Sequence, residues 1–161
     1  MIESIGVEEL EPQHGAAMVG RCEAEQIGPF VGEAYAAVLA ALGRQGLAPV
    51  GPPFVRYATG GADGMDAGGH AYVFGVTAGF PCASPAAADG EVVPVELQGG
   101  SAVVAMHVGA WTDMGAAYGA VADYMSEHGL VPAGDAWETY LDGPEVEEHR
   151  TVLRAPCRPA S

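Results

Sequence analysis

The chain has 161 residues, of which 49% are hydrophobic and 17% are charged, so it can bury a sizeable core as one globular domain. Its formal net charge is -15, and its six basic residues are all arginines, which argues against direct binding to nucleic acid. No apolar run is long enough to span a membrane, and the N-terminus MIESIGVEELEP is acidic where a secretion signal would be basic. We therefore expect a soluble, cytoplasmic protein with no membrane partner.

Three cysteines, Cys22, Cys82 and Cys157, are too few and too scattered for a disulfide framework. They also lack the paired Cys or His spacing of a zinc site. We expect reduced thiols, no metal and no cofactor.

The first half of the chain predicts a helix set among strands. The expected elements are strands near Ile2–Leu10 and Ala16–Cys22, a helix from about Pro29 to Gln45, a strand at Pro53–Thr59, a Gly/Asp loop at Gly60–Gly69 and a strand ending near Phe80. The inner face of the helix is predicted from its spacing to be Val31, Tyr35, Val38, Leu39 and Leu42. Gly46 and Pro49 are expected to end the helix.

The second half repeats this order. Its expected elements are strands at Val92–Leu97 and Ala102–Val108 around a turn at Gln98–Gly100, a helix capped by Thr112, a strand at Ala136–Leu141 and a strand from about His149 to Ala155. The predicted buried stripe of the helix is Met114, Ala117, Tyr118, Val121, Met125 and His128. Gly129 and Pro132 are expected to end this helix.

A twelve-residue segment occurs twice, 83 positions apart. Gly46–Tyr57 reads GLAPVGPPFVRY and Gly129–Tyr140 reads GLVPAGDAWETY, with five identical positions. We interpret the chain as an α+β fold with a duplicated strand-helix-strand-strand repeat, pseudo-twofold symmetry, antiparallel sheets and a central ligand cleft. The predicted boundaries within this single domain are repeat one at about 2–82, a linker at 83–90 and repeat two at about 91–157.

The sharpest mismatch in the repeated segment sets Val55 against Glu138. Strand side chains alternate, so Glu138 and Tyr140 point one way and Trp137 points the other. Each helix covers one sheet face, and we expect the uncovered faces to surround the cleft. Glu138, Tyr140, Tyr57 and Val55 are then predicted to line it, while Trp137 packs under a helix unless a twist turns it to the ligand.

A carboxylate among aromatic rings favours a flat cation, because the rings stack on it and the carboxylate supplies the countercharge. Glu138 could equally be an exposed strand residue. Trp111 and Phe30 each follow a glycine where a helix is expected to start, so they are either ligand contacts or staples that pack the helix. His107 could form an acid–base couple with Glu138, or be a hydrogen-bonded structural group.

The chain resembles the GyrI-like small-molecule-binding family. The segments that carry the resemblance are GPPFVRY (51–57), GAW (109–111), AAYGAVADYMSEHGLVPAG (116–134) and WETYL (137–141). Members serve as effector domains of AraC-type and MerR-type regulators or occur as stand-alone proteins. The resemblance implies two pseudosymmetric repeats around a cleft for aromatic, often cationic compounds, with the family's glutamate at Glu138 and its aromatic residues at Trp111, Tyr57 and Tyr140.

Three functions remain open at this point. The first is binding of a hydrophobic, aromatic or cationic small molecule for sensing or sequestration. The second, implied by the resemblance, is hydrolytic opening of a strained cyclopropane ring in a natural product, with Glu138 and Tyr140 as catalytic residues. The third is inhibition of a basic protein partner by the acidic surface.

Overall fold

Two compact units make up the chain in the computed structural model, which describes residues 1–58, 73–143 and 145–160. The α1 unit is Gln13–Leu97, and the α2 unit is Met1–Pro12 together with Gln98–Ser161. The predicted loop Gly60–Gly69 lies outside the described residues. No helix in the described ranges is long and apolar enough to cross a membrane.

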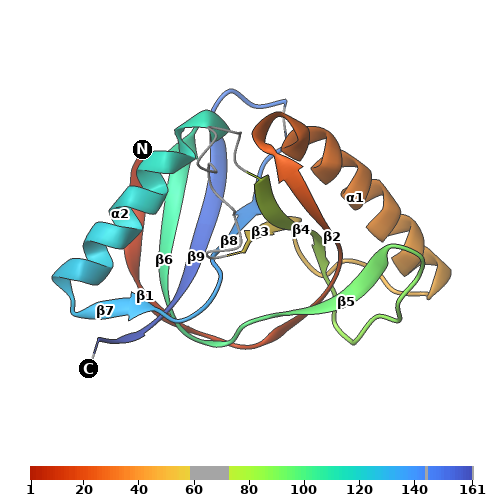
Figure 1. Cartoon of the computed structure of the whole chain (residues 1–161), viewed down its shortest axis with the longest axis horizontal. Coiled ribbons are helices and arrows are strands. Elements are labelled where there is room, and N and C mark those ends of the chain that lie inside the picture. Colours follow the sequence, from red (N-terminus) through yellow and green to blue (C-terminus); the bar gives the residue numbers. More distant parts are fainter. Residues whose placement is uncertain (59–72, 144, 161) are drawn as a thin grey trace. The chain divides into compact units, whose positions relative to one another are not determined.

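In the α1 unit, one helix packs on an antiparallel sheet with the strand order β3-β4-β2-β5 (Figure 1). The elements are β2 (Gln13–Glu23), α1 (Ala24–Arg44), β3 (Phe54–Tyr57), β4 (Val73–Pro81) and β5 (Val92–Leu97). Helix α1 contacts mainly β2 and β4, the two inner strands.

The α2 unit has an antiparallel sheet with the strand order β1-β6-β9-β8, and its helix lies along β6 (Figure 1). The elements are β1 (Ile2–Leu10), β6 (Gly100–Gly109), the 3-10 turn η1 (Trp111–Asp113), α2 (Met114–Glu127), β7 (Leu130–Pro132), β8 (Trp137–Tyr140) and β9 (His149–Pro159). The short β7, which pairs with β9, was not predicted. The α+β class with two helices and antiparallel strands is confirmed.

The two strands on either side of Gln98–Gly100 do not pair with each other. Strand β5 pairs with β2, and β6 pairs with β1. Gly99 lies against Pro12, so closely that a Cβ on Gly99 would be 2.7 Å from Pro12 Cδ. The first strand of each predicted repeat, β1 or β5, therefore pairs with the second strand of the other repeat.

The repeated segment has the same structural role in both units. It begins with Gly46 (φ 70°) and Gly129 (φ 66°), which follow the ends of α1 and α2 in a left-handed conformation that favours glycine. The next prolines pair with matching cysteines, Pro49 with Cys82 and Pro132 with Cys157. All three cysteines of the chain are buried free thiols.

The two copies of the segment also end in equivalent strand pairings. Val55 pairs with Ala78 on β4, and Glu138 pairs with Leu153 on β9. Val55 and Glu138 therefore occupy equivalent positions in the two units, as the sequence alignment predicts.

The core of the α2 unit lies between α2 and the sheet. Its buried residues are Val103, Ala105, Met114, Ala117, Val121, Met125, Leu153, Ala155 and Cys157. The predicted stripe is confirmed at four positions, but His128 is exposed. Thr112 does not cap the helix, because it lies within η1 and the N-cap position falls on Asp113.

Helix α1 begins at Ala24, five residues before the predicted start. Glu23 and Gln26 form a capping box there, in which Gln26 Oε1 accepts from the Glu23 backbone N–H at 2.9 Å. Leu39, predicted to lie on the inner face, is 46% exposed. The buried line is instead Ala34, Val38, Ala41 and Leu42, because the alanines let the helix approach the sheet closely.

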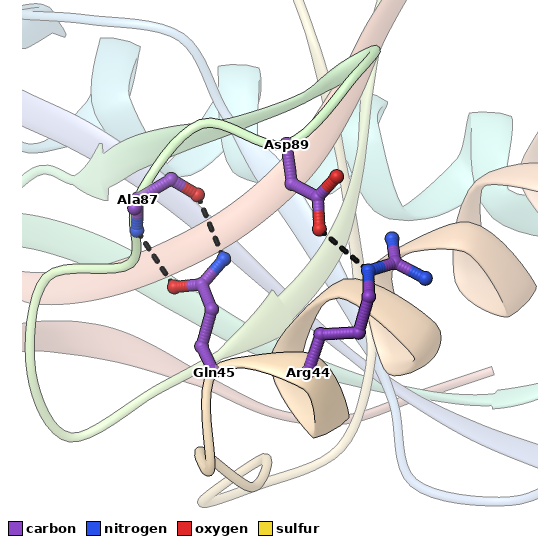
Figure 2. A network of polar contacts seen from close by, with 4 residues as sticks. All are labelled: Arg44, Gln45, Ala87 and Asp89. Carbon is purple, nitrogen blue, oxygen red and sulfur yellow. Dashed lines mark hydrogen bonds and ion pairs between the residues drawn. The ribbon is translucent and has the colours of Figure 1, made fainter.

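The predicted linker is fastened to the C-terminal end of α1 (Figure 2). Gln45 donates its side-chain amide to the Ala87 carbonyl at 2.9 Å and accepts from the Ala87 N–H at 2.8 Å. Arg44 and Asp89 form an ion pair at 2.8 Å beside this contact.

Gln45→Ala is expected to lower the free energy of unfolding by about 1 kcal/mol, because it breaks two hydrogen bonds to the Ala87 backbone. Arg44→Ala is expected to change it by less than about 0.5 kcal/mol, because the Arg44 side chain is 60% exposed and its ion pair is screened by water. Urea unfolding of both variants measures the difference. A larger loss for Arg44→Ala would contradict this ranking.

Candidate functional site

Glu138 is a buried carboxylate that faces α2. It is 6% exposed, and its ladder partner Leu153 belongs to the core under the helix. Directly opposite residues of an antiparallel pair lie on the same face, so Glu138 shares that face. The expectation that Glu138 lies on a helix-free face is therefore wrong. Strand alternation predicts which residues share a face, but not which face the helix covers.

Two tyrosine hydroxyls bind the carboxylate of Glu138. Tyr118 on α2 donates to Oε2 at 2.6 Å, and Tyr140 on β8 donates to Oε1 at 2.8 Å. Tyr140 was predicted as a site residue, whereas Tyr118 was assigned only to the buried stripe. A signal for Tyr118 exists in the sequence, because Tyr35 precedes it by the same 83 positions that separate Tyr57 from Tyr140.

Burial governs the acidity of this group. Loss of solvation raises the pKa of Glu138, and the hydrogen bonds from Tyr118 and Tyr140 lower it in part. No basic side chain in the described part of the chain forms an ion pair with Glu138. The carboxylate is stabilised by neutral donors alone, so its charge is incompletely compensated.

Tyr118→Phe is expected to raise the pKa of Glu138 further, because it removes the donor to Oε2. Stability should fall by about 2 kcal/mol where Glu138 is ionised, and by less at acid pH, where the carboxyl is protonated. NMR titration of the Glu138 carboxyl carbon measures the pKa, and urea unfolding at two pH values measures the stability. An unchanged pKa would show that Tyr118 contributes little.

Aromatic rings extend from the carboxylate toward the surface. Trp111, on η1, meets the ring of Tyr140 edge-on at 5.6 Å between centroids. It also stacks on His149 at 3.9 Å with an interplanar angle of 17°. Trp111 is 39% exposed, so this wall leads from solvent to the Tyr140 hydroxyl that binds Glu138.

His107 is fully buried in the same unit. Neither of its ring nitrogens has a hydrogen-bond partner among the described residues, so the interpretation of a hydrogen-bonded structural group is wrong. Burial lowers the pKa of His107, and the N-terminal amine lowers it further while Asp113 opposes this. No hydrogen bond joins His107 to Glu138, and the predicted acid–base couple is not formed in this structure.

Trp137 lies on the sheet face opposite Glu138 and is 4% exposed. Its neighbour on that face is Thr139, whose hydroxyl accepts from Arg154 Nη1 at 3.0 Å. Trp137 is therefore buried, but not under α2, which covers the face of Glu138.

The remaining predicted residues lie in the α1 unit. Val55 is 1% exposed, and Tyr57 meets Phe74 edge-on at 6.3 Å between ring centroids. Phe30 lies inside α1, whose start is at Ala24, and its ring packs on Gly20. The placement of Phe30 at the start of the helix is therefore wrong. A contribution of these residues to one site with Glu138 stays a prediction.

Both units have tyrosines at equivalent positions, but among the described residues only the α2 unit has a carboxylate beside them. The matched pairs, each 83 positions apart, are Tyr35 with Tyr118, Val55 with Glu138 and Tyr57 with Tyr140. Tyr35 lies within 3.4 Å of the Phe54 backbone carbonyl, to which it donates, where Tyr118 donates to a carboxylate. The carboxylate makes the α2 unit chemically distinct from the α1 unit.

The chain thus combines an α+β fold of two helices on antiparallel strands with a buried carboxylate held by two tyrosine hydroxyls. The chain matches the GyrI-like small molecule binding domain over residues 4–157. The protein belongs to this family.

Solved structures of low sequence identity share the fold. The crystal structure of the EcmrR C-terminal domain has a TM-score of 0.73 and 15% identity, with 97% of this chain and 98% of that one covered. EcmrR in the cryo-EM structure of an EcmrR–DNA complex has a TM-score of 0.69 and 14% identity, and this chain spans 57% of that EcmrR chain. A hydrolase encoded by lin2189 from Listeria innocua has a TM-score of 0.62 and 14% identity, with coverage of 96% and 91%. No curated protein matches the chain significantly.

Proposed function

We propose that the protein binds a hydrophobic, aromatic, cationic small molecule at Glu138. The observation that supports this most is the buried carboxylate, which two tyrosine hydroxyls hold and no cationic side chain of the described residues neutralises. A buried charge without a countercharge is costly, and hydrogen bonds offset only part of that cost. A bound cation would supply the missing charge.

The aromatic wall supports the same ligand class. Tyr140 donates to the carboxylate, Trp111 lies against Tyr140, and His149 stacks on Trp111. Such aromatic rings attract flat cations. Sensing or sequestration of such a compound is the role that we propose. Membership of a small-molecule-binding family supports binding in general.

A thermal-shift screen of aromatic cations and their neutral analogues tests the proposal. A cation at one hundred times its dissociation constant should stabilise the wild type by about 2.7 kcal/mol. Glu138→Gln should lose most of this response. Glu33→Gln, which removes a charge from the exposed side of α1, should keep it. If no compound stabilises the wild type, or both variants respond equally, the charge role of Glu138 fails.

Hydrolysis is the second candidate. Burial raises the pKa of Glu138, which is the direction needed for a carboxyl that exchanges protons near neutral pH, and the Tyr140 hydroxyl lies 2.8 Å away. A hydrolase from Listeria innocua shares the fold. Mass spectrometry of compounds that carry strained cyclopropane rings, incubated with wild type and Glu138→Gln, separates the two functions. Products heavier by one water would favour catalysis, and unchanged compounds would favour binding.

A further inference from the structure

A row of three residues crosses the sheet of the α2 unit next to Glu138. His107 on β6 pairs with Thr151 on β9, and Thr151 pairs with Tyr140 on β8. Paired residues share a face, so all three side chains lie on the side that Glu138 occupies. The row therefore extends the Glu138 site across the sheet, because Tyr140 belongs to the row and donates its hydroxyl to Glu138.

Polar atoms gather along this row without partners. Nδ1 and Nε2 of His107, Oγ1 of Thr151 and Nδ1 of His149 are buried, and no hydrogen bond reaches them from the described residues. His107 and Thr151 are 0% exposed. Buried polar groups nearly always have a partner, because an unmade hydrogen bond is costly. Four such atoms on adjacent residues of two strands indicate a place where a partner binds.

The fold itself does not require polar side chains here. The α1 unit has an equivalent row, in which Val76 pairs with Gly20 and with Tyr57. Val76 therefore occupies the position that Thr151 has in the α2 unit. The ring of Phe30 covers that row, since a Cβ on Gly20 would be 2.7 Å from Phe30 Cε1. An equivalent row in the same chain is thus filled by apolar groups. The polar atoms of the α2 unit therefore serve something other than packing.

We propose that His107 and Thr151 form a neutral hydrogen-bonding subsite that receives a hydroxyl or carbonyl group of the ligand whose cationic part lies at Glu138. This inference rests on the proposed function. A threonine hydroxyl and a neutral imidazole each both donate and accept, so the pair accommodates either group. Burial and the N-terminal amine lower the pKa of His107, which keeps the ring uncharged.

The subsite narrows the ligand class. The favoured ligand is an aromatic cation with a hydroxyl or carbonyl group set apart from its positive charge. An aromatic cation without such a group would bind at Glu138 but gain no hydrogen bond from His107 or Thr151, so it would bind less tightly.

Calorimetry with two matched probes tests the subsite. The probes are tetraphenylphosphonium and its (4-hydroxyphenyl)triphenylphosphonium analogue. The wild type should bind the hydroxylated probe about tenfold more tightly, which corresponds to about 1.4 kcal/mol. Thr151→Val, which introduces the residue that the α1 unit has at this position, should abolish the preference, because the hydroxylated probe then gains no hydrogen bond from Thr151. Thr139→Val, on the opposite sheet face, should keep the preference.

Stability of the ligand-free protein gives an independent measurement. Thr151→Val should leave the thermal midpoint unchanged or raise it, because it removes an unpaired buried hydroxyl. A lowered midpoint with unchanged affinities would show that a structural water satisfies the row, and would overturn the subsite. Equal affinity of the wild type for both probes, with binding that Glu138→Gln weakens, would overturn the subsite but not the proposed function. If neither probe binds the wild type, both fail.

Discussion

Replacing Gly79 by alanine is expected to destabilise the protein by about 3 kcal/mol or more. Gly79 lies on β4 between its ladder partners Ala17 and Phe54. A Cβ at this position would be 2.7 Å from the Ala17 Cα and closer still to the carbonyl oxygen of Ala16. These neighbours are backbone atoms of the adjacent strand, so they cannot rotate away. The strands must separate, which breaks hydrogen bonds in the centre of the α1 sheet.

The same substitution at Gly32 is the matched control and should have the opposite sign. Gly32 lies on the exposed side of α1, and a Cβ there would meet nothing within 4 Å. Gly32→Ala should stabilise the protein by about 0.5 to 1 kcal/mol, because alanine loses less backbone entropy in a helix. Urea unfolding of both variants measures the contrast. A stable, cooperatively unfolding Gly79→Ala would show that the strands move apart at little cost.

Local patterns predicted the elements well. The bounds of β1 and β5 match the expected Ile2–Leu10 and Val92–Leu97, because polar and turn-forming residues delimit both strands. The repeated segment predicted equivalent helix ends, since the two glycines follow the helices at positive φ. Val55 and Glu138, the central mismatch of the repeated segment, also occupy equivalent positions in the strand pairings of the two sheets.

Strand pairing and the covered face could not be predicted in this way. A strand pattern carries no record of its partner, so the exchange of β1 and β5 between the two halves was missed. Alternation placed Glu138 and Tyr140 on one face, yet only the packing of α2 decides that this face is the covered one. The role of Tyr118 was missed for a similar reason, because helical spacing does not distinguish a core contact from a hydrogen bond.

The polar row beside Glu138 was predicted only in part. His107 stood out in the sequence as a single histidine at the end of a strand. Thr151 did not stand out, because threonine is common in strands. Their relation depends on the register between β6 and β9, a contact between residues 44 positions apart in the chain.

An aromatic cation is expected to bind more tightly as the pH rises through the pKa of Glu138. The ionised carboxylate attracts the cation, whereas the protonated carboxyl does not, and burial places this pKa above its usual range. Calorimetric titration of tetraphenylphosphonium across the pH range in which carboxyl groups and histidines titrate measures the effect. A neutral aromatic analogue should show no corresponding increase.

Glu138→Gln separates this carboxylate from the histidines on the same face, His107 and His149. Gain of charge on a histidine at low pH would weaken cation binding in the same direction. The variant should bind the cation about thirtyfold more weakly at high pH, which corresponds to about 2 kcal/mol, and should lose the Glu138 part of the pH profile. A pH profile that is identical in Glu138→Gln would assign the dependence to the histidines.

A rise in pH is expected to strengthen cation binding at Glu138 but to lower the stability of the ligand-free protein. Because the folded-state pKa of Glu138 is raised, its contribution to stability is fully present below the unfolded-state pKa and is lost as the pH rises through the folded-state value. A bound cation offsets that loss by compensating the ionised carboxylate. The thermal stabilisation by a saturating cation should therefore grow with pH in the wild type and grow less in Glu138→Gln. A shift that does not depend on pH in the wild type would place the cation away from Glu138.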